Sequence, residues 1–412
     1  MAFAPWAKTI SHFLTYLMMR QHLLLPFLFL LLGMACQKKE LPDIHAIENG
    51  LLLDQQPEGS PVQTFSLAER MEHYQVPGLS IAVVEKGKLK WAKGYGIAHT
   101  GTGQAVDTET LFQAGSISKP VAALAVLKLV QEGLLDLDVD VNQYLKEWQV
   151  PENAFTAKEK VTLRGLLSHT AGVNVHGFPG YKQTDPFPSL VEVLNGSGNT
   201  PPIEVDKLPG SGWRYSGGGY TIFEKVVEEV TGRAFERYME EEILLPLGMR
   251  NSSYEQPIGG RWQKNSSAAY DRQGEILEGF WHNYPEKAAA GLWTTPTELA
   301  KYCIAIQEIR GGKEDGLLRP ELVEQMLTEQ DGSWGLGPAL EQREGRLLFK
   351  HGGKNAGFTN QLIAFADEGN AVIVMTNADR GNGLIRELLH AVSAYYGWGI
   401  SSPKLVAPES AD

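Results

Sequence analysis

Hydrophobic and polar positions change their period twice along the chain. Residues 80–94 show short β-type runs separated at Lys86-Gly87, which predicts an early hairpin. Helical spacing of apolar positions then dominates residues 116–306, before strand-type runs return and one more apolar helix follows. We expect helices at residues 121–130, 223–230, 299–306 and 384–396, and the later strands at residues 346–350, 361–365 and 371–375.

Strands at both ends of the chain with helices between them indicate an α/β fold. We expect one antiparallel sheet built from N- and C-terminal segments and flanked by helices, with an all-helical lobe at roughly residues 135–300. A cleft between the sheet and this lobe is the natural place for a site. The folded domain should span residues 62–399, followed by a polar tail at residues 400–412.

The N-terminus has the pattern of an export signal. A 13-residue uncharged apolar run precedes Cys36, whereas a helix needs about 20 apolar residues to cross a bilayer. The Gly-Met-Ala-Cys sequence ending at Cys36 resembles the lipobox of bacterial lipoproteins. We therefore expect a signal peptide at residues 1–35, a lipid anchor on Cys36 and a tether at residues 36–61, which would hold the protein on the periplasmic side of a bacterial membrane. A plain secretory signal, giving a soluble periplasmic or secreted protein, is the alternative.

Composition excludes several functional classes. The 412 residues are 43% hydrophobic and 21% charged, as in ordinary globular proteins. The formal charge of −12 opposes binding to a phosphate backbone, so we expect no nucleic-acid partner. The ten histidines show no HExxH spacing, and no CxxC, phosphate-loop or dinucleotide fingerprint occurs, so we expect neither a metal nor a cofactor. Lipidation of Cys36 would leave only Cys303, which rules out an intrachain disulfide.

The tetrapeptide Ser-x-x-Lys occurs twice, at Ser116 to Lys119 and at Ser401 to Lys404. The second copy lies in the polar tail, whereas Ser116 precedes a helical run with Pro120 in its first turn, so Ser116 should lie at a helix N-terminus. Residues i and i+3 share a helix face, so the Lys119 amine can reach the Ser116 hydroxyl. Such a lysine acts as a base only where burial or a nearby cation favours its neutral form. The alternative role for Ser116 is a simple N-cap.

Two further stretches could complete a catalytic site. Tyr215 lies in a Gly-rich turn just before a helix, where its phenol could point into the cleft, although a buried structural tyrosine is the alternative. The run His351-Gly352-Gly353-Lys354 lies between two expected strands, and its glycines would let a substrate approach the backbone closely. A bulged hairpin with a surface histidine is the alternative for this run.

With these three motifs the chain resembles the superfamily of class C β-lactamases and D-Ala-D-Ala carboxypeptidases, which also contains esterases and D-aminopeptidases. The flanking sequences TLFQAGSISKP, VTLRGLLSHTAG, PLGM and AGLWTT carry the same resemblance, which extends over residues 64–398. It implies a cleft between an α/β domain and an all-helical region. It also implies that Ser116 is the acyl-accepting nucleophile, that Lys119 and Tyr215 share a proton relay, and that backbone N–H groups of Ser116 and Lys354 form an oxyanion hole. No metal or organic cofactor is implied.

Two departures from the family pattern bear on the substrate. Gly217 stands where lactam and peptide hydrolases of the family usually have Asn, and the third motif begins with His351 instead of Lys. A histidine is largely neutral at pH 7, so a permanent cation for a substrate carboxylate is lost, although Lys350 or Lys354 could supply charge. We therefore expect a serine hydrolase acting on a small ester or amide. A true β-lactamase or a D,D-carboxypeptidase acting on cell-wall peptides is one alternative, and a non-catalytic lipoprotein that binds muropeptides or a partner protein is another.

Other polar residues in tempting positions are interpreted as structural. His169, in the sequence SHTAG, belongs to a shared scaffold segment, and the relay already has its base. Asp136, Asp138 and Asp140 should form a loop and a helix cap, because the downstream Glu of a calcium loop is missing. The tryptophans are expected in the core or in the cleft wall.

Overall fold

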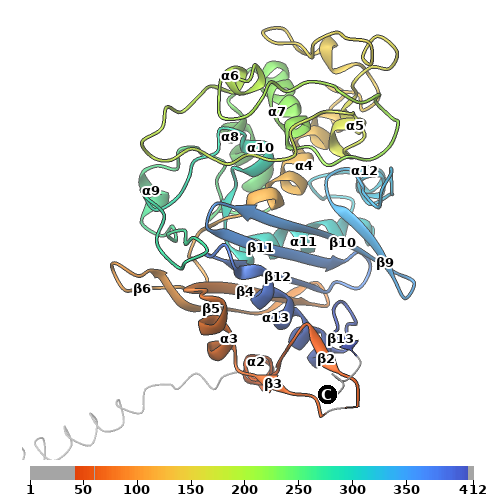
Figure 1. Cartoon of the computed structure of the whole chain (residues 1–412). Coiled ribbons are helices and arrows are strands. Elements are labelled where there is room, and N and C mark those ends of the chain that lie inside the picture. The colour runs from red at the N-terminus through yellow and green to blue at the C-terminus, as the bar shows by residue number, and fades with distance from the viewer. Residues whose placement is uncertain (1–41, 60, 407–412) are drawn as a thin grey trace, which may run out of the picture. The chain divides into compact units, whose positions relative to one another are not determined.

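The structure is a computed structural model that describes residues 42–59 and 61–406 (Figure 1). The expected signal peptide, Cys36 and residues 407–412 lie outside the described residues. A short helix, α2 (Pro42–Glu48), forms a separate unit, and the rest of the chain from Asn49 onward forms the main body. Among the described residues, no helix combines the length and the apolarity that a bilayer crossing requires.

A seven-stranded antiparallel sheet lies at the centre of the main body, with strand order β6-β5-β4-β12-β11-β10-β9. The first long strands of the chain therefore lie beside the last ones, with Ile81 of β4 opposite Val374 of β12. This order confirms the expected α/β fold class with a sheet built from both ends of the chain. The strands are β4 (Gly78–Glu85), β5 (Lys88–His99), β6 (Gln104–Ala105), β9 (Ala339–Arg343), β10 (Arg346–Asn355), β11 (Phe358–Phe365) and β12 (Ala371–Thr376).

The hairpin of β4 and β5 forms where the sequence predicts it. Lys86 and Gly87 both have positive φ, 52° and 73°, which suits a tight hairpin turn. Nearly all of β4 is buried, as its continuous apolar run indicates for a central strand. The pattern misses β9, because this edge strand carries polar side chains such as Glu341 and Arg343.

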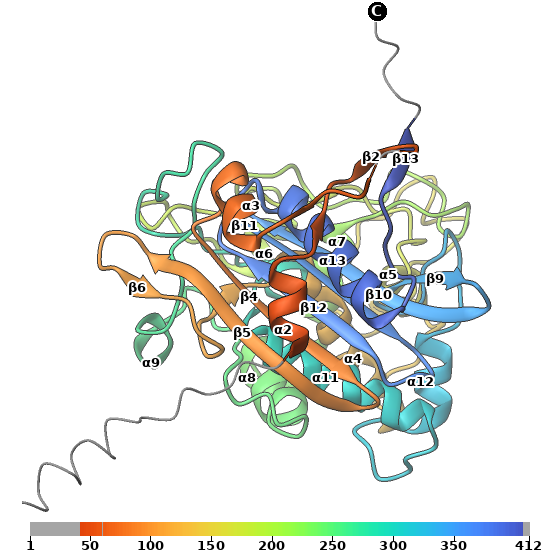
Figure 2. The same ribbon diagram turned by 90° about the horizontal axis from the view of Figure 1, so that it is seen from below.

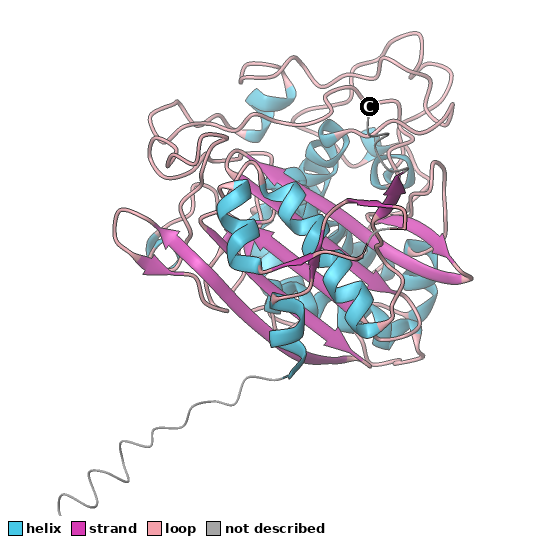
Figure 3. Ribbon diagram, turned by 60° about the horizontal axis from the view of Figure 1, so that its bottom comes forward, coloured by secondary structure: helices cyan, strands magenta, loops and turns pink. Residues whose placement is uncertain are grey.

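Helices cover both faces of the sheet. α13 (Gly381–Tyr396) and α3 (Leu67–Tyr74) lie over one face, and α11 (Pro296–Arg310) lies over the other (Figures 2 and 3). A buried ion pair between Arg70 of α3 and Glu387 of α13, with Nε to Oε2 at 2.6 Å, joins the first pair of helices. The expected helices at residues 299–306 and 384–396 are thus confirmed as parts of α11 and α13.

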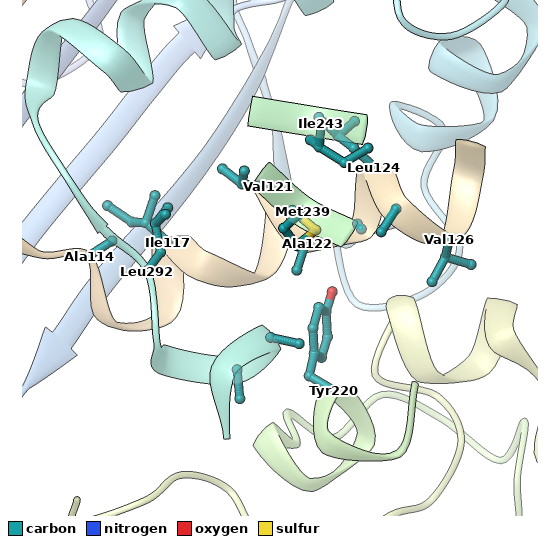
Figure 4. Packing of buried hydrophobic residues seen from close by; sticks show 14 of the residues in the cluster. Ala114, Ile117, Val121, Ala122, Leu124, Val126, Tyr220, Met239, Ile243 and Leu292 are labelled. Carbon is teal, nitrogen blue, oxygen red and sulfur yellow. The ribbon is translucent and has the colours of Figure 1, made fainter. Parts of the chain in front are cut away.

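Several of the remaining helical segments, among them α7, α10 and η3, contact α4, a central helix whose residues 118–127 are all buried. Figure 4 shows Val121, Ala122 and Leu124 of this helix near Tyr220, Met239 and Ile243. Burial on every side explains why apolar residues occur all round α4. The helical segments on this side of the sheet are η1 (Gly115–Ile117), α4 (Ser118–Gln131), η2 (Val141–Gln143), α5 (Leu163–Leu167), α6 (Leu190–Leu194), α7 (Gly217–Thr231), α8 (Phe235–Tyr238), η3 (Met239–Leu244), α9 (Gly260–Gln263), α10 (Lys287–Ala290) and α12 (Pro320–Met326).

Part of the segment expected as a polar tail pairs with the N-terminal region. β13 runs parallel to β2, with Lys404 opposite Gln55. Just before this strand, the Ser401 hydroxyl lies 2.7 Å from Nδ1 of His390. The second Ser-x-x-Lys therefore lies in a C-terminal segment that packs on the main body through β2 and His390. The short strands are β1 (Leu51–Leu52), β2 (Gln55–Pro57), β3 (Thr64–Phe65), β7 (Phe112–Gln113), β8 (Trp293–Thr294) and β13 (Lys404–Val406).

Candidate active site

The structure brings Ser116 and Lys119 together at the start of α4. Ser116 lies in η1, and Lys119 Nζ donates a hydrogen bond to its Oγ at 3.1 Å. The same amine donates to the Ala289 carbonyl oxygen at 2.8 Å. Ser116 does not act as an N-cap, because its hydroxyl makes no capping bond, and the neighbouring Ser118 hydroxyl bonds Gly115 O instead. The Ser116 oxygen is therefore available for reaction.

Burial prepares Lys119 to act as a base. The residue is only 2% exposed, and desolvation lowers the pKa of its amine from 10.5 to about 7. At neutral pH a large fraction of the amine is therefore uncharged. In that form its lone pair can accept the Ser116 proton across the 3.1 Å contact, while an N–H remains bonded to Ala289.

Tyr215 approaches the same pair from the residue before the N-cap of α7. Its hydroxyl is buried and makes no hydrogen bond among the described residues. Burial raises the pKa of Tyr215, and the nearby Ser116 hydroxyl offsets this only in part. The Lys119 amine lies 5.0 Å from the centre of the Tyr215 ring. The phenol therefore stays protonated at neutral pH and has a proton to donate.

His169 contacts both the Tyr215 ring and the backbone of the next residue. The Ser216 backbone N–H donates to His169 Nδ1 at 3.1 Å, and the imidazole lies 4.2 Å from the Tyr215 ring, centroid to centroid. Burial, and next the charge of Lys119, lower the pKa of His169 well below its usual value. A neutral ring with these contacts supports the tyrosine and has no bond to the Ser116 oxygen.

The backbone of the third motif, residues 351–354, lies directly against the backbone of the segment that carries Ser116. A Cβ added to Gly353 would lie 2.0 Å from the Ala114 carbonyl oxygen, and one added to Gly115 would lie 2.5 Å from the Lys354 nitrogen. Only glycine permits both approaches, and Gly115 also has a positive φ of 55°. The two glycines therefore let β10 lie directly against η1.

The strand register determines that the Lys354 N–H points from β10 toward η1. Arg343 and Arg346 flank a two-residue turn and form the hydrogen-bonded pair of the hairpin. Backbone groups alternate between the two edges of a strand, so Lys354, like Arg346, directs its N–H away from β11. Pairing with β9 ends opposite Lys350, which leaves the Lys354 N–H facing η1. This placement suits the expected oxyanion hole.

We expect Gly353→Ala to lower the free energy of unfolding by about 1–3 kcal/mol, because the added methyl group overlaps the Ala114 carbonyl. Thermal unfolding measures this loss. Gly352→Ala is the matched control, since its Cβ would lie 3.5 Å from the nearest atom. Equal unfolding temperatures for the two variants would contradict the proposed tight contact.

The charged groups of the third motif are neutral or paired. His351 is 4% exposed, and burial, with Lys119 adding to it, lowers its pKa from 6.5 to about 3. Lys350 forms an ion pair with Glu341, and Lys354 Nζ lies 3.3 Å from Asp379 Oδ1. The two lysines that could have replaced the missing cation are thus engaged by carboxylates.

These groups line a cavity of about 380 Å³. Sequence reasoning missed four of its residues and expected Trp213 only in general terms, as one of the tryptophans of the core or the cleft wall. The four missed residues carry no sequence signal. The lining consists of the expected Ser116, Tyr215, His351, Gly352, Gly353 and Lys354, of Trp213, and of the missed His176, Asn360, Gln361 and Asn382.

The space beside Gly217 is occupied. A Cβ at this position would lie 2.8 Å from Phe178 Cε2 and 3.2 Å from the His176 carbonyl oxygen. The Gly217 N–H donates to that same carbonyl at 3.0 Å. The loop segment around His176 thus covers the position that carries Asn in lactam and peptide hydrolases of the family.

The Asp136 region has the contacts of a loop and a cap. Asp138 pairs with Arg164 at 2.7 Å, and Asp140 accepts from the N–H of Asn142 at the start of η2. Within residues 42–59 and 61–406, no group of three or more His, Cys, Asp or Glu side chains could hold a metal ion.

Comparisons with known proteins show what the chain is similar to. The family model described as Beta-lactamase matches residues 66–395. Protein flp of Staphylococcus aureus (strain MRSA252) is 29% identical over 227 residues, which cover 54% of this chain and 42% of that protein. Esterase EstB of Burkholderia gladioli is 29% identical over 200 residues, covering 45% of this chain and 49% of the esterase. The matched part therefore spans about half the length of these relatives.

Two solved structures match a larger share of the chain than these two sequence relatives do. The octameric penicillin-binding protein homologue from Pyrococcus abyssi has a TM-score of 0.67 at 25% identity, covering 82% of this chain and 76% of that one. FmtA from Staphylococcus aureus has a TM-score of 0.62 at 20% identity, covering 83% and 90%. The second likeness concerns the fold alone.

Proposed function

The chain belongs to the beta-lactamase family, and from this premise we propose that it is a serine hydrolase that forms an acyl-serine at Ser116 on a small ester or amide. The observation that carries the proposal is the contact of Lys119 Nζ with Ser116 Oγ at 3.1 Å, made by a buried amine whose pKa is lowered to about 7. Such a pair is a nucleophile with its base.

The proposed reaction has two halves. In the first, neutral Lys119 accepts the Ser116 proton as Oγ attacks the substrate carbonyl, and the N–H groups of Ser116 and Lys354 stabilise the oxyanion. Tyr215 then donates its proton to the leaving group, and Lys119 returns a proton to the phenol. In the second half, the same groups activate water, which releases the acid and frees Ser116.

Three observations favour an esterase or amidase over a β-lactamase or a D,D-carboxypeptidase. His351 is neutral, Gly217 is covered by the His176 segment, and Lys354 is paired with Asp379. These features weaken the recognition of a substrate carboxylate. The similarity to a protein named Esterase EstB supports the same preference.

Labelling with a fluorophosphonate probe, read by intact mass and peptide mapping, tests the proposal. We expect one adduct, on Ser116. We also expect faster hydrolysis of p-nitrophenyl acetate than of nitrocefin. A protein that gives neither an adduct nor turnover would fit the non-catalytic binding protein better.

The pH dependence should follow the Lys119 amine. Because only the neutral amine accepts a proton and its pKa is lowered to about 7, kcat/KM for a neutral ester should rise through about pH 7 and level off above it. Initial rates with p-nitrophenyl acetate, corrected for spontaneous hydrolysis, measure this profile. A profile that falls across the same range would mean that the protonated amine is the active form.

A further inference from the structure

An aromatic rim borders the cavity, and the proposed reaction gives it no chemical role. We define the rim as Trp213 and His176, which both line the cavity. Their rings lie 6.5 Å and 4.9 Å from the Tyr215 ring, centroid to centroid. Trp213 is 37% exposed, which is a large apolar surface to leave in water beside a nucleophile. Exposed aromatic side chains at a cavity are typical of ligand contacts.

The rim is held in place without a ligand. The Trp213 indole packs against Trp334 with centroids 5.4 Å apart, and Trp334 Nε1 donates to the Gly337 carbonyl at 3.1 Å. Behind the indole, a Cβ on Gly332 would come within 2.6 Å of Trp213 Cγ, so the backbone lies directly against the ring. The His176 backbone is held by its carbonyl, which accepts from the Gly217 N–H at 3.0 Å, and its imidazole lies against the Tyr215 ring. A surface organised in this way binds without a large ordering cost.

The position of the rim identifies the part of the substrate that it contacts. Tyr215 is the proposed proton donor to the leaving group, so the leaving group must lie beside its hydroxyl, and the rim packs against the ring of the same tyrosine. An anionic leaving group would have to compete for the nearby cation, because His351 is neutral and Lys354 already pairs with Asp379. Planar uncharged groups gain from stacking on aromatic rings.

We propose that the rim binds an uncharged, planar leaving group, so that the substrates are esters or amides of benzyl-type alcohols or amines. The proposal rests on the proposed function for the identity of the leaving-group side. It differs from recognition of an amino-acid leaving group, whose carboxylate would find no unpaired cation among the described residues that line the cavity.

Three acetates that share one acyl group test the proposal: benzyl acetate, cyclohexylmethyl acetate and 4-carboxybenzyl acetate. We expect kcat/KM of the wild-type protein to be highest for benzyl acetate. Trp213→Ala should lower that value about three- to tenfold, as expected for loss of an aromatic pair, and should lower the value for the cyclohexylmethyl ester less. Trp213→Phe should keep most of the preference.

A matched variant controls for the loss of an exposed aromatic side chain. Phe155 is 38% exposed and is not among the cavity-lining residues, so Phe155→Ala should leave the benzyl preference unchanged. Equal kcat/KM for benzyl and cyclohexylmethyl acetate in the wild-type protein, or no effect of Trp213→Ala on their ratio, would overturn the proposal.

Binding separates this inference from the proposed function. The Ser116→Ala protein cannot form the acyl-serine, and calorimetric titration should still show tighter binding of benzyl acetate than of cyclohexylmethyl acetate. Adding Trp213→Ala should abolish the difference. If that preference is found but fluorophosphonate does not label Ser116 in the wild-type protein, the rim stands and the hydrolase proposal fails. If both esters bind equally or not detectably, and fluorophosphonate labels Ser116, the hydrolase proposal stands and the rim proposal fails.

Discussion

Replacing Ser116 with Ala should lower kcat for p-nitrophenyl acetate by a factor on the order of 10⁴ or more, because the step that forms the acyl-enzyme loses its nucleophile. The side chain makes no helix cap, so its removal should leave the fold intact. Initial rates and far-UV circular dichroism of the purified variant measure both effects.

The chain provides a matched control for this variant. Ser401 also begins a Ser-x-x-Lys tetrapeptide, but its hydroxyl contacts His390 and Lys404 lies exposed in β13. Ser401→Ala should therefore keep wild-type turnover. Wild-type rates in Ser116→Ala would mean that another residue carries the reaction.

Replacing Lys119 with Met should lower kcat/KM by at least about a hundredfold, which is the usual effect of removing a general base. Methionine fills most of the buried volume, so the comparison isolates the amine. Lys119→Arg should not restore activity, because a guanidinium stays charged and cannot accept the Ser116 proton. Steady-state kinetics at about pH 8 compares the three proteins at a pH where the wild-type amine is mainly neutral.

Thermal unfolding distinguishes a lost base from a damaged fold. The pKa of Lys119 is lower in the folded protein than in the unfolded chain, so burying the amine costs stability at any pH below the unfolded value. That cost is largest below about pH 7 and disappears as the pH rises toward 10.5. Lys119→Met should therefore unfold at a temperature no lower than wild type at about pH 6. An unfolding temperature below that of the wild-type protein at about pH 6 would contradict the expected cost of burying the amine.

Local patterns carried most of the fold prediction. The β4 to β5 hairpin depends on two adjacent apolar runs and the turn at Lys86-Gly87. The pairing of Ser116 with Lys119 depends on a spacing of three residues at a helix start. Both are short-range features, so the sequence displays them directly. The edge strand β9 escapes the same reasoning, because one of its sides faces solvent and its side chains are largely polar.

The environment of the site depends on contacts between distant segments. Nothing near His351 in the sequence indicates that it is buried beside Lys119, or that Asp379 pairs with Lys354. The approach of Gly353 to Ala114 joins residues far apart in the chain. Sequence reasoning could therefore identify the reacting groups, but not their pKa values or the residues that line the cavity.

The backbone contact between η1 and β10 has an evolutionary consequence. Because Gly115 and Gly353 bring η1 against the Lys354 backbone without any side chain, this part of the site places no demand on the side chain at position 351. A change of side chain at position 351 therefore acts on the substrate pocket and on the Tyr215 ring, and not through the backbone contact. Such a separation of side-chain roles from backbone roles allows one scaffold to diversify among descendants.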